Sequence, residues 1–217
     1  MNNILFASGN YGKFNEIKAL FKKFQLDDYQ LLFAGDLSNL TEPEENGHSF
    51  TENAIIKAKY YGESTNMIAL ADDSGLSIPQ INNLPGLYSA RFAVNPNGKK
   101  DFNYAFGKIY KMLKDKNLDP EIENIEAYFT CSLAIFNPHN QKLHSFEAKV
   151  NGKLRFPPIG NLGFGYDPIF IRNGDNKTFG EIGSDEKDNI SHRGLVFIDF
   201  AKFLHKNNAI FHLKSEI

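Results

Sequence analysis

The sequence predicts an α/β fold: a single two-lobed domain over residues 1–217, on a long mixed β-sheet flanked by helices, with the functional site in the cleft between the lobes. The chain opens with a strand-helix-strand pattern, which favours parallel pairing. Two long apolar runs in the middle, joined by turn residues, are typical of an antiparallel hairpin. With 217 residues, of which 41% are hydrophobic, the chain can bury one substantial core.

The predicted strands are short apolar runs bounded by turn residues. They cover residues 2–8, 29–34, 67–71, 76–81, 124–136, 142–154 and 167–171. The run at 67–71 is predicted to end at Asp72-Asp73, because two adjacent like charges are costly in a buried strand. The hairpin is expected to turn at "NPHNQ", residues 137–141.

The predicted helices carry apolar residues at helical spacing. They cover residues 13–24, 49–62, 101–114 and 193–206. Ser49 and Glu52 form a capping box at the start of the second helix, and Asp101 is the expected cap of the third. No internal repeat, low-complexity tract or linker interrupts the pattern, so one domain is expected.

Composition excludes several classes of protein. The 24 basic and 26 acidic residues give a net charge of -2, which argues against a general electrostatic grip on nucleic acid. The N-terminal "MNNILFASGN" lacks the basic region of a signal peptide, and no apolar run approaches the length of a membrane span. The single cysteine, Cys131, rules out an internal disulfide and lies in an apolar strand pattern typical of a core thiol. A soluble, cytoplasmic protein is expected, with neither nucleic acid nor membrane as a partner.

The segment "SGNYGK", Ser8 to Lys13, lies between the first strand and the first helix. Small residues there expose backbone N–H groups, the helix N-terminus carries partial positive charge, and Lys13 adds a full one. This combination suits a phosphate group. Taken alone, the segment is better explained as an ordinary strand-helix turn.

Carboxylates gather in two places. Asp72 and Asp73 follow an apolar strand, where they suit either a turn or Mg²⁺, which prefers one or two carboxylates plus phosphate oxygens. The segment "TEPEENG" carries Glu42, Glu44 and Glu45 ahead of a helix, where a solvated acidic loop is the simpler interpretation.

A fourth cluster lies in "GFGYDPIF" and "DEKDNISHRG". Phe164 stands between glycines, so its ring is accessible for stacking. Lys187, His192 and Arg193 precede the last helix, and the planar donors of Arg193 suit a phosphate or a carbonyl group. Phosphate-binding groups, a carboxylate metal site, an aromatic platform and polar donors together suit a nucleoside triphosphate.

In these motifs the chain resembles a known family, the inosine/xanthosine triphosphate pyrophosphatases (Ham1-like enzymes). The resemblance rests on six motifs in order: "SGNYGK", "SFTENAIIKA", "ADDSGL", "LPGLYSARFA", "GFGYDPIF" and "ISHRG". It implies hydrolysis of non-standard purine triphosphates (ITP, dITP, XTP) to the monophosphate and pyrophosphate, with Mg²⁺ as cofactor and a homodimer as the working form.

The resemblance also implies roles for individual residues. Asp73 matches the proton acceptor and a metal-associated position, Asp72 would support it, and Ser74 would contact substrate. Glu45 is expected to be the other metal carboxylate, with Glu44 as the alternative. The triphosphate would be bound by Ser8, Gly9, Asn10, Tyr11, Gly12 and Lys13.

The base would bind a pocket formed by Phe164, Gly165, Tyr166 and Asp167, with Phe164 stacking and Asp167 contacting the ring edge. Lys187 would contact phosphate, while His192 and Arg193 would address the 6-oxo face of the base.

The sequence departs from the family pattern at two positions. Ile159 stands where the family often has arginine, and Leu195 where a small residue is common. Neither is assigned a central role, so the activity prediction stands. Two rival hypotheses remain: a non-enzymatic nucleotide-binding module, and a general nucleotide phosphatase that releases orthophosphate.

Overall fold

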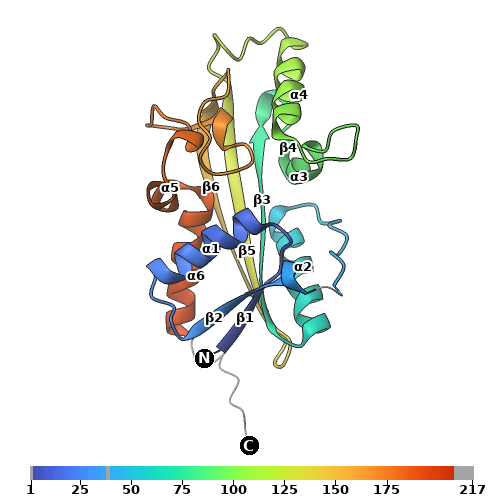
Figure 1. Cartoon of the computed structure of the whole chain (residues 1–217), viewed down its shortest axis with the longest axis vertical. Helices are drawn as coiled ribbons and strands as arrows, with labels where there is room; N and C mark the ends of the chain where they lie inside the picture. The colour runs from blue at the N-terminus through green and yellow to red at the C-terminus, as the bar shows by residue number, and fades with distance from the viewer. Residues whose placement is uncertain (1, 38–39, 208–217) are drawn as a thin grey trace, which may run out of the picture. The chain divides into compact units, whose positions relative to one another are not determined.

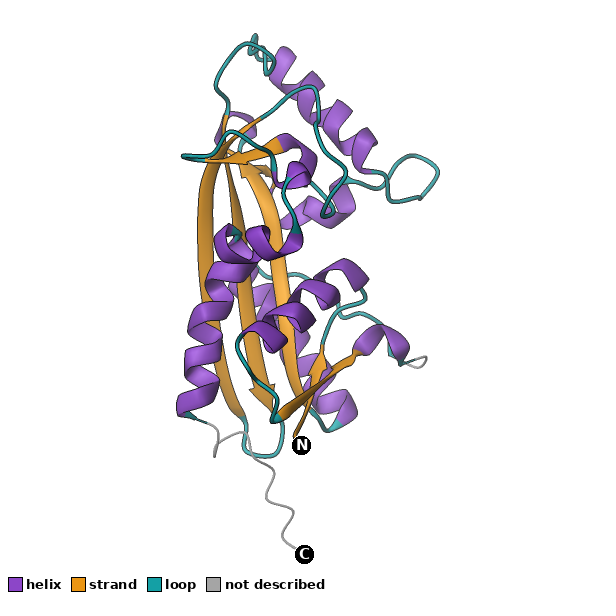
Figure 2. Ribbon diagram, turned by 60° about the vertical axis from the view of Figure 1, so that its left-hand side comes forward, coloured by secondary structure: helices purple, strands orange, loops and turns teal. Residues whose placement is uncertain are grey.

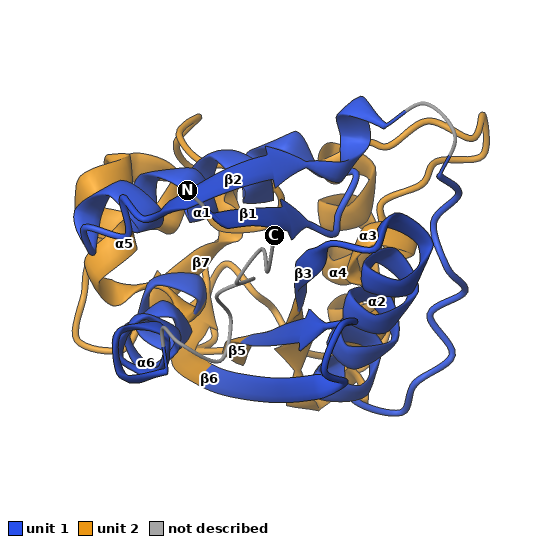
Figure 3. Cartoon of the chain, turned by 90° about the horizontal axis from the view of Figure 1, so that it is seen from below, with its two compact units in different colours: residues 1–73, 131–148, 193–217 blue, residues 74–130, 149–192 orange. Residues whose placement is uncertain are grey.

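The structure is a computed structural model that describes residues 2–37 and 40–207. Figure 1 shows the order of the elements along the chain. The chain forms two compact units, coloured separately in Figure 3. Unit 1 comprises Met1–Asp73, Cys131–Ala148 and Arg193–Ile217, and unit 2 comprises Ser74–Thr130 and Lys149–His192. The boundary between them falls directly after Asp73 and again directly after His192.

The strands form one mixed sheet, drawn in orange in Figure 2, with the order β2-β1-β3-β5-β6-β7 and with β4 paired to β3. Their bounds are β1 Asn2–Phe6, β2 Tyr29–Phe33, β3 Ile68–Ile78, β4 Leu84–Pro85, β5 Glu126–Asn137, β6 Lys142–Leu154 and β7 Phe170–Arg172. Strand β1 pairs in parallel with β2 and β3, while β3–β4 and β6–β7 are antiparallel. The mixed α/β sheet predicted from the sequence is confirmed.

One strand prediction is wrong. Instead of ending at Asp72-Asp73 and starting again at Leu76, β3 continues from Ile68 to Ile78 through both carboxylates. Side chains alternate between the two faces of a strand, so adjacent aspartates point apart. Each aspartate then needs a charge partner only on its own face of the sheet, so the strand can continue through both residues.

The main helices agree with the prediction to within a few residues. Their bounds are α1 Tyr11–Lys23, α2 Phe50–Thr65, α3 Ser89–Phe92, α4 Phe102–Lys114, α5 Ser184–Ile190 and α6 His192–Lys206. The short helices α3 and α5 were not predicted. Residues Asp167–Ile169 form a 3-10 turn ahead of β7 rather than part of the strand, because Pro168 fixes φ and has no N–H to donate.

Ser49 and Asp101 cap their helices as predicted, but the Glu52 carboxylate of the predicted capping box bonds to the N–H of His48, one residue before the cap. Asp101 accepts a hydrogen bond from the Tyr104 N–H at 3.2 Å, and Ser49 accepts one from the Glu52 N–H at 3.1 Å. The Glu52 carboxylate accepts from the His48 N–H at 2.7 Å, so the helix start also holds the loop that precedes it.

The core of unit 1 lies on both faces of its part of the sheet. On one face, α1 and α6 pack against Ile4, Phe6, Ile68 and Leu70. On the other face, α2 packs against their sequence neighbours, which include Leu5, Ala7, Ala69 and Ala71. The alternation along β3 therefore puts Asp72 on the α1/α6 face and Asp73 on the α2 face.

The core of unit 2 is rich in aromatic rings. Phe129 of β5 lies 4.7 Å from Phe170 and 6.1 Å from Phe179, measured between ring centroids. Tyr166 packs against Phe102 and Phe106 of α4 at 5.2 and 6.1 Å. Among the residues that the structure describes, no helix combines the length and the apolar character required to cross a membrane.

Candidate active site

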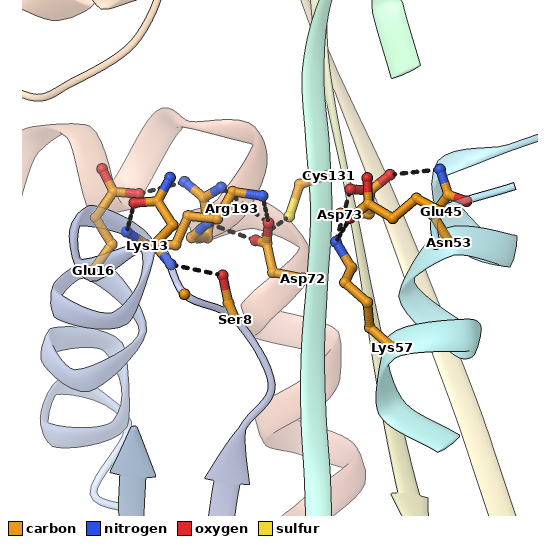
Figure 4. A network of polar contacts seen from close by, with 12 residues as sticks. Ser8, Lys13, Glu16, Glu45, Asn53, Lys57, Asp72, Asp73, Cys131 and Arg193 are labelled. Atoms are coloured by element: carbon orange, nitrogen blue, oxygen red, sulfur yellow. Dashed lines mark hydrogen bonds and ion pairs between the residues drawn. The ribbon is translucent and has the colours of Figure 1, made fainter. Parts of the chain in front are cut away.

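The two adjacent aspartates of β3 enter two separate polar networks. In Figure 4 their side chains leave the strand in opposite directions, Asp72 toward α1 and α6 and Asp73 toward α2. Asp72 has no exposed surface, and Asp73 is 6% exposed. The carboxylates therefore differ in partners, in charge environment and in what each can do chemically.

Asp72 is held by two cations and a thiol. Lys13 Nζ lies 2.5 Å from its Oδ1, and Arg193 Nε donates to its Oδ2 at 2.7 Å. Burial alone would raise the pKa of the Asp72 carboxyl, but Arg193 and Lys13 outweigh it and hold that pKa well below its usual range. Asp72 is a permanent anion, suited to fixing the two cations and unsuited to accepting a proton.

Cys131 completes the Asp72 network. Its Sγ donates to Asp72 Oδ2 at 3.1 Å, and the side chain is fully buried. Burial and the neighbouring Asp72 charge raise the pKa of the thiol well above its usual value, so the sulfur keeps its proton and acts as a donor. The expectation of a buried core thiol is confirmed.

Arg193 lies inside this network. Besides Asp72, its guanidinium meets Glu16 of α1, with NH1 and Oε2 2.5 Å apart. The Arg193 side chain is 2% exposed. Two carboxylates thus fix the guanidinium at the start of α6, a structural role that the sequence did not predict. Contact between Arg193 and the base remains a prediction.

Asp73 faces α2, where Lys57 and Asn53 hold one oxygen each. Lys57 Nζ donates to Asp73 Oδ1 at 2.9 Å, and Asn53 Nδ2 donates to Asp73 Oδ2 at 3.3 Å. Burial raises the pKa of the Asp73 carboxyl above its usual value, although Lys57 opposes the shift, and the nearby Glu45 carboxylate raises it further. A carboxylate of raised pKa is the better proton acceptor of the two.

Lys57 joins Asp73 to the acidic loop. Its ammonium also lies 2.8 Å from Glu45 Oε1. Burial would lower the pKa of Lys57, but Asp73 and Glu45 outweigh it and raise that pKa, so the ammonium stays charged. Of the two alternatives left open by the sequence, Glu45 is the carboxylate that shares a partner with Asp73.

The donor set around Lys57 fits a divalent cation. Glu45 and Asp73 converge on one positive charge, and Mg²⁺ is commonly bound by one or two protein carboxylates with water and phosphate as the other ligands. Within residues 2–37 and 40–207, no group of three or more His, Cys, Asp or Glu side chains is placed to hold a metal ion.

The predicted phosphate loop has the expected strand-to-helix geometry. Asn10 caps α1 by accepting from the Lys13 N–H at 3.2 Å, and its own N–H donates to Ser8 Oγ at 3.1 Å. The Gly9 N–H donates to Glu42 Oε1 at 3.2 Å, so a carboxylate already stands at this backbone donor. Tyr11 and Gly12 lie in the first turn of α1, where Tyr11 is 63% exposed.

In unit 2 the structure brings three of the predicted residues together. Lys187 Nζ lies 2.5 Å from Asp167 Oδ2, and this oxygen also accepts from the Phe164 N–H at 2.8 Å. The same ammonium lies 5.0 Å from the centroid of the Phe164 ring, a cation–π contact. Asp167 and Lys187 thus fix the turn that carries Phe164, and Gly165 follows it at φ 70°, a left-handed conformation that favours glycine.

His192 and Tyr166 are buried in the same unit. The His192 ring stacks on Phe129 with centroids 4.5 Å apart and planes 6° apart. Tyr166 donates its hydroxyl to the Ser89 carbonyl at 2.8 Å. Ser74 follows Asp73 within β3 and is the first residue of unit 2.

Sequence reasoning missed Asn53, Lys57 and Glu16. Asn53 and Lys57 lie four residues apart on α2, the spacing that places two side chains on one helix face. Glu16 follows Lys13 by three residues on α1, so it also shares a face with a predicted site residue. Polar residues on an otherwise apolar helix face were the available signal in both cases.

Known proteins are similar to this chain over most of its length. The family model described as Ham1 family matches residues 4–203. A protein of Zymomonas mobilis named dITP/XTP pyrophosphatase is 40% identical over 194 residues, covering 89% of this chain and 88% of its own length. A Bacillus subtilis protein of the same name is 37% identical over 204 residues, covering 94% of this chain and 98% of its own length.

Solved structures resemble the fold closely. The Ham1 protein of Staphylococcus aureus superposes with a TM-score of 0.78 at 32% identity, covering 94% of this chain and 99% of that chain. A Ham1 protein from Coxiella burnetii gives a TM-score of 0.80 at 31% identity, covering 95% of this chain and 100% of that chain. With the whole-chain sequence match, these similarities establish that this chain belongs to the Ham1 family.

Proposed function

We propose that this chain hydrolyses non-standard purine nucleoside triphosphates such as dITP, ITP and XTP, releasing the nucleoside monophosphate and pyrophosphate. The observation that carries the proposal is the separation of the two carboxylates at β3. Asp73 shares Lys57 with Glu45 on one face of the strand, whereas Lys13 and Arg193 hold Asp72 on the other. Relatives at 36–40% identity are named for this activity, which supports the same reaction here.

In the proposed reaction Asp73 accepts a proton from the water that attacks the α-phosphorus. The bond from that phosphorus to its bridging oxygen then breaks, and pyrophosphate leaves. Lys57 orients Asp73 and lowers its pKa against the raising effect of burial. Glu45 and Asp73 would hold Mg²⁺, which when bound offsets the negative charge on the phosphates.

The remaining predicted residues are assigned to the substrate. The backbone and side chains of the Ser8–Lys13 loop and Ser74 would bind the triphosphate, with Lys187 as a further phosphate contact. Phe164 would stack on the base, with Gly165, Tyr166, Asp167, His192 and Arg193 forming the rest of the pocket. We further propose a cytoplasmic enzyme that works as a homodimer.

The test is a panel of ITP, XTP, dITP, ATP and GTP incubated with Mg²⁺, with pyrophosphate and orthophosphate measured separately. We expect pyrophosphate from ITP, XTP and dITP, with GTP and ATP well behind. Adenine presents a donor where the pocket offers donors, and each buried mismatch costs about 1–3 kcal/mol. Orthophosphate as the product would identify a general phosphatase, and binding without turnover a nucleotide-binding module.

A further inference from the structure

Asn53 is a buried amide in the first turn of α2, 1% exposed, and both ends of its side chain are used. Its Oδ1 accepts from the Gly47 N–H at 2.9 Å, and its Nδ2 donates to Asp73 Oδ2 at 3.3 Å. An amide flipped by 180° would present oxygen to a carboxylate and nitrogen to an N–H, so only this orientation satisfies both contacts. One side chain therefore connects the acidic loop to Asp73.

The packing around Gly47 provides an independent sign of the same connection. A Cβ atom at Gly47 would lie 2.7 Å from Asn53 Oδ1 and 2.8 Å from Glu52 Cβ, closer than such atoms approach in proteins. The loop can press against the start of α2 only because this residue has no side chain. Since Glu45 lies two residues before Gly47, the contact also fixes the part of the loop that supplies Glu45 to Lys57.

The two oxygens of Asp73 are held in different ways. Lys57 on Oδ1 contributes a full positive charge, while Asn53 on Oδ2 contributes a neutral donor. A neutral donor fixes the rotation of the carboxylate without neutralising it, which a proton acceptor needs. Asn53 and Lys57 lie one helical turn apart on α2, so one rigid element sets both contacts.

From these contacts we propose that Asn53 is a positioning residue for the reaction. It sets the rotation of the Asp73 carboxylate and couples that rotation to the acidic loop. The inference rests on the proposed function, in which Asp73 accepts the proton of the attacking water. It goes beyond that function by assigning to Asn53 a role that acts through the Asp73 carboxylate.

Asn53→Asp separates the two contacts. The aspartate keeps an acceptor for the Gly47 N–H, but it removes the donor to Asp73 and faces it with a second carboxylate. We expect kcat for ITP to fall about 10- to 100-fold with KM little changed, because a small misplacement of a catalytic group has that effect on rate. Asn53→Ala removes both contacts and should also lower kcat. If thermal unfolding shows that Asn53→Asp does not fold, Asn53→Ala is the variant that tests the proposal.

Glu52→Ala is the matched control. Glu52 holds the same loop through the His48 N–H at 2.7 Å, whereas the Asp73 carboxylate is held by Asn53 and Lys57. We expect its kcat to stay within about twofold of wild type, because Asn53 and Lys57 still hold Asp73 in place and Glu45 keeps its ion pair with Lys57. Hydrogen exchange over residues 45–48 provides a readout other than activity. Exchange should quicken in Asn53→Ala and Glu52→Ala and stay slow in Asn53→Asp.

Two results together would support the inference. In Asn53→Asp, residues 45–48 should exchange hydrogen slowly while kcat is low. In Glu52→Ala, the same residues should exchange faster while kcat is normal. A folded Asn53→Asp with wild-type kcat would overturn it, as would equal losses of kcat in Asn53→Ala and Glu52→Ala. A wild-type protein that releases no pyrophosphate would overturn the proposed function itself, and the inference with it.

Discussion

Asp72 and Asp73 are neighbours in β3, yet their carboxylates lie on opposite faces of the sheet and have pKa values shifted in opposite directions. Asp72 is neutralised by Lys13 and Arg193, whereas Asp73 shares the single charge of Lys57 with Glu45. The first environment holds a carboxylate in its charged form, and the second leaves one ready to take a proton. The alternation of a strand is enough to separate the two roles.

Asp72→Asn should destabilise the protein strongly. It leaves Arg193 and Lys13 facing a neutral amide, and breaking a buried ion pair costs about 3–5 kcal/mol. For a chain of this size that corresponds to a fall in Tm of roughly 10 °C. Thermal unfolding at pH 7 measures it. As a control, Asp175→Asn breaks the partly exposed pair with Arg172 and should cost about 1 kcal/mol or less.

The difference in stability between wild type and Asp72→Asn should depend on pH in a way that follows from the lowered pKa of Asp72. Because the pKa of Asp72 is lower in the folded than in the unfolded state, its contribution is complete above the unfolded value of about 3.9. It is lost as the pH falls further, through the folded-state pKa. The stability gap between wild type and Asp72→Asn should therefore be constant near neutrality and narrow only in strong acid. A gap that closes between pH 5 and pH 8 would show that another group is responsible.

Lys57→Met should move the acid limb of the pH–rate profile to higher pH. The Lys57 ammonium lowers the pKa of Asp73 against the raising effect of burial, so its loss lets that pKa rise. More of Asp73 is then protonated near neutrality and turnover falls. The measurement is kcat/KM for ITP across pH, with Lys59→Met, an exposed lysine on the same helix, as the control. If the acid limb of the pH–rate profile does not move, Lys57 does not control the ionisation of Asp73.

Glu42→Ala should tighten substrate binding. The Glu42 carboxylate accepts from the Gly9 N–H in the predicted phosphate loop, where a phosphate oxygen would have to displace it. Removing one competing hydrogen bond of about 0.5–1.5 kcal/mol predicts a KM for ITP lower by about two- to tenfold, with kcat retained. Glu63→Ala removes the same charge from an exposed position on α2 and should leave KM as it is. Equal effects of both variants would point to net charge instead.

Local patterns predicted most of the fold. The apolar spacing of α1, α2, α4 and α6 gave those helices, and Ser49, Asp101 and Asn10 occupy caps that their side-chain chemistry favours. The long strands β5 and β6 and their connection at residues 138–141 were also predicted. These features depend on interactions within one element or between neighbours in sequence.

The predictions that were wrong or missing concern contacts between residues that are distant in sequence. The continuation of β3 through two aspartates depends on Lys13, Arg193 and Lys57, which come from three helices distant in sequence. Burying a charge is costly, as the prediction assumed. The cost is offset here by contacts with residues far away in the sequence, which a short stretch of sequence does not reveal. For the same reason the role of Arg193 as a partner of Asp72 and Glu16 was not anticipated.

The candidate site was predicted in part. Asp73 and Glu45 share Lys57 as a partner, and Phe164, Asp167 and Lys187 lie together, although Lys187 was assigned to phosphate and the other two to the base. Their roles toward a nucleotide stay predictions, because they concern a ligand and not the packing of the chain. Lys57 and Asn53 were overlooked because a polar residue on a helix gains meaning only once the opposing strand is known.

The most direct test of the account is the rate of pyrophosphate release from ITP by Asp73→Asn. An amide cannot accept the proton of the attacking water and is a poorer ligand for Mg²⁺, so we expect a loss of about two to four decades in kcat. The amide keeps one acceptor oxygen for Lys57 and loses the one that accepts from Asn53. The fold should be retained, since Lys57 keeps its ion pair with Glu45 and no buried cation is left without a partner. A folded Asp73→Asn that releases pyrophosphate at nearly the wild-type rate would remove Asp73 from the chemistry and contradict the division of roles along β3.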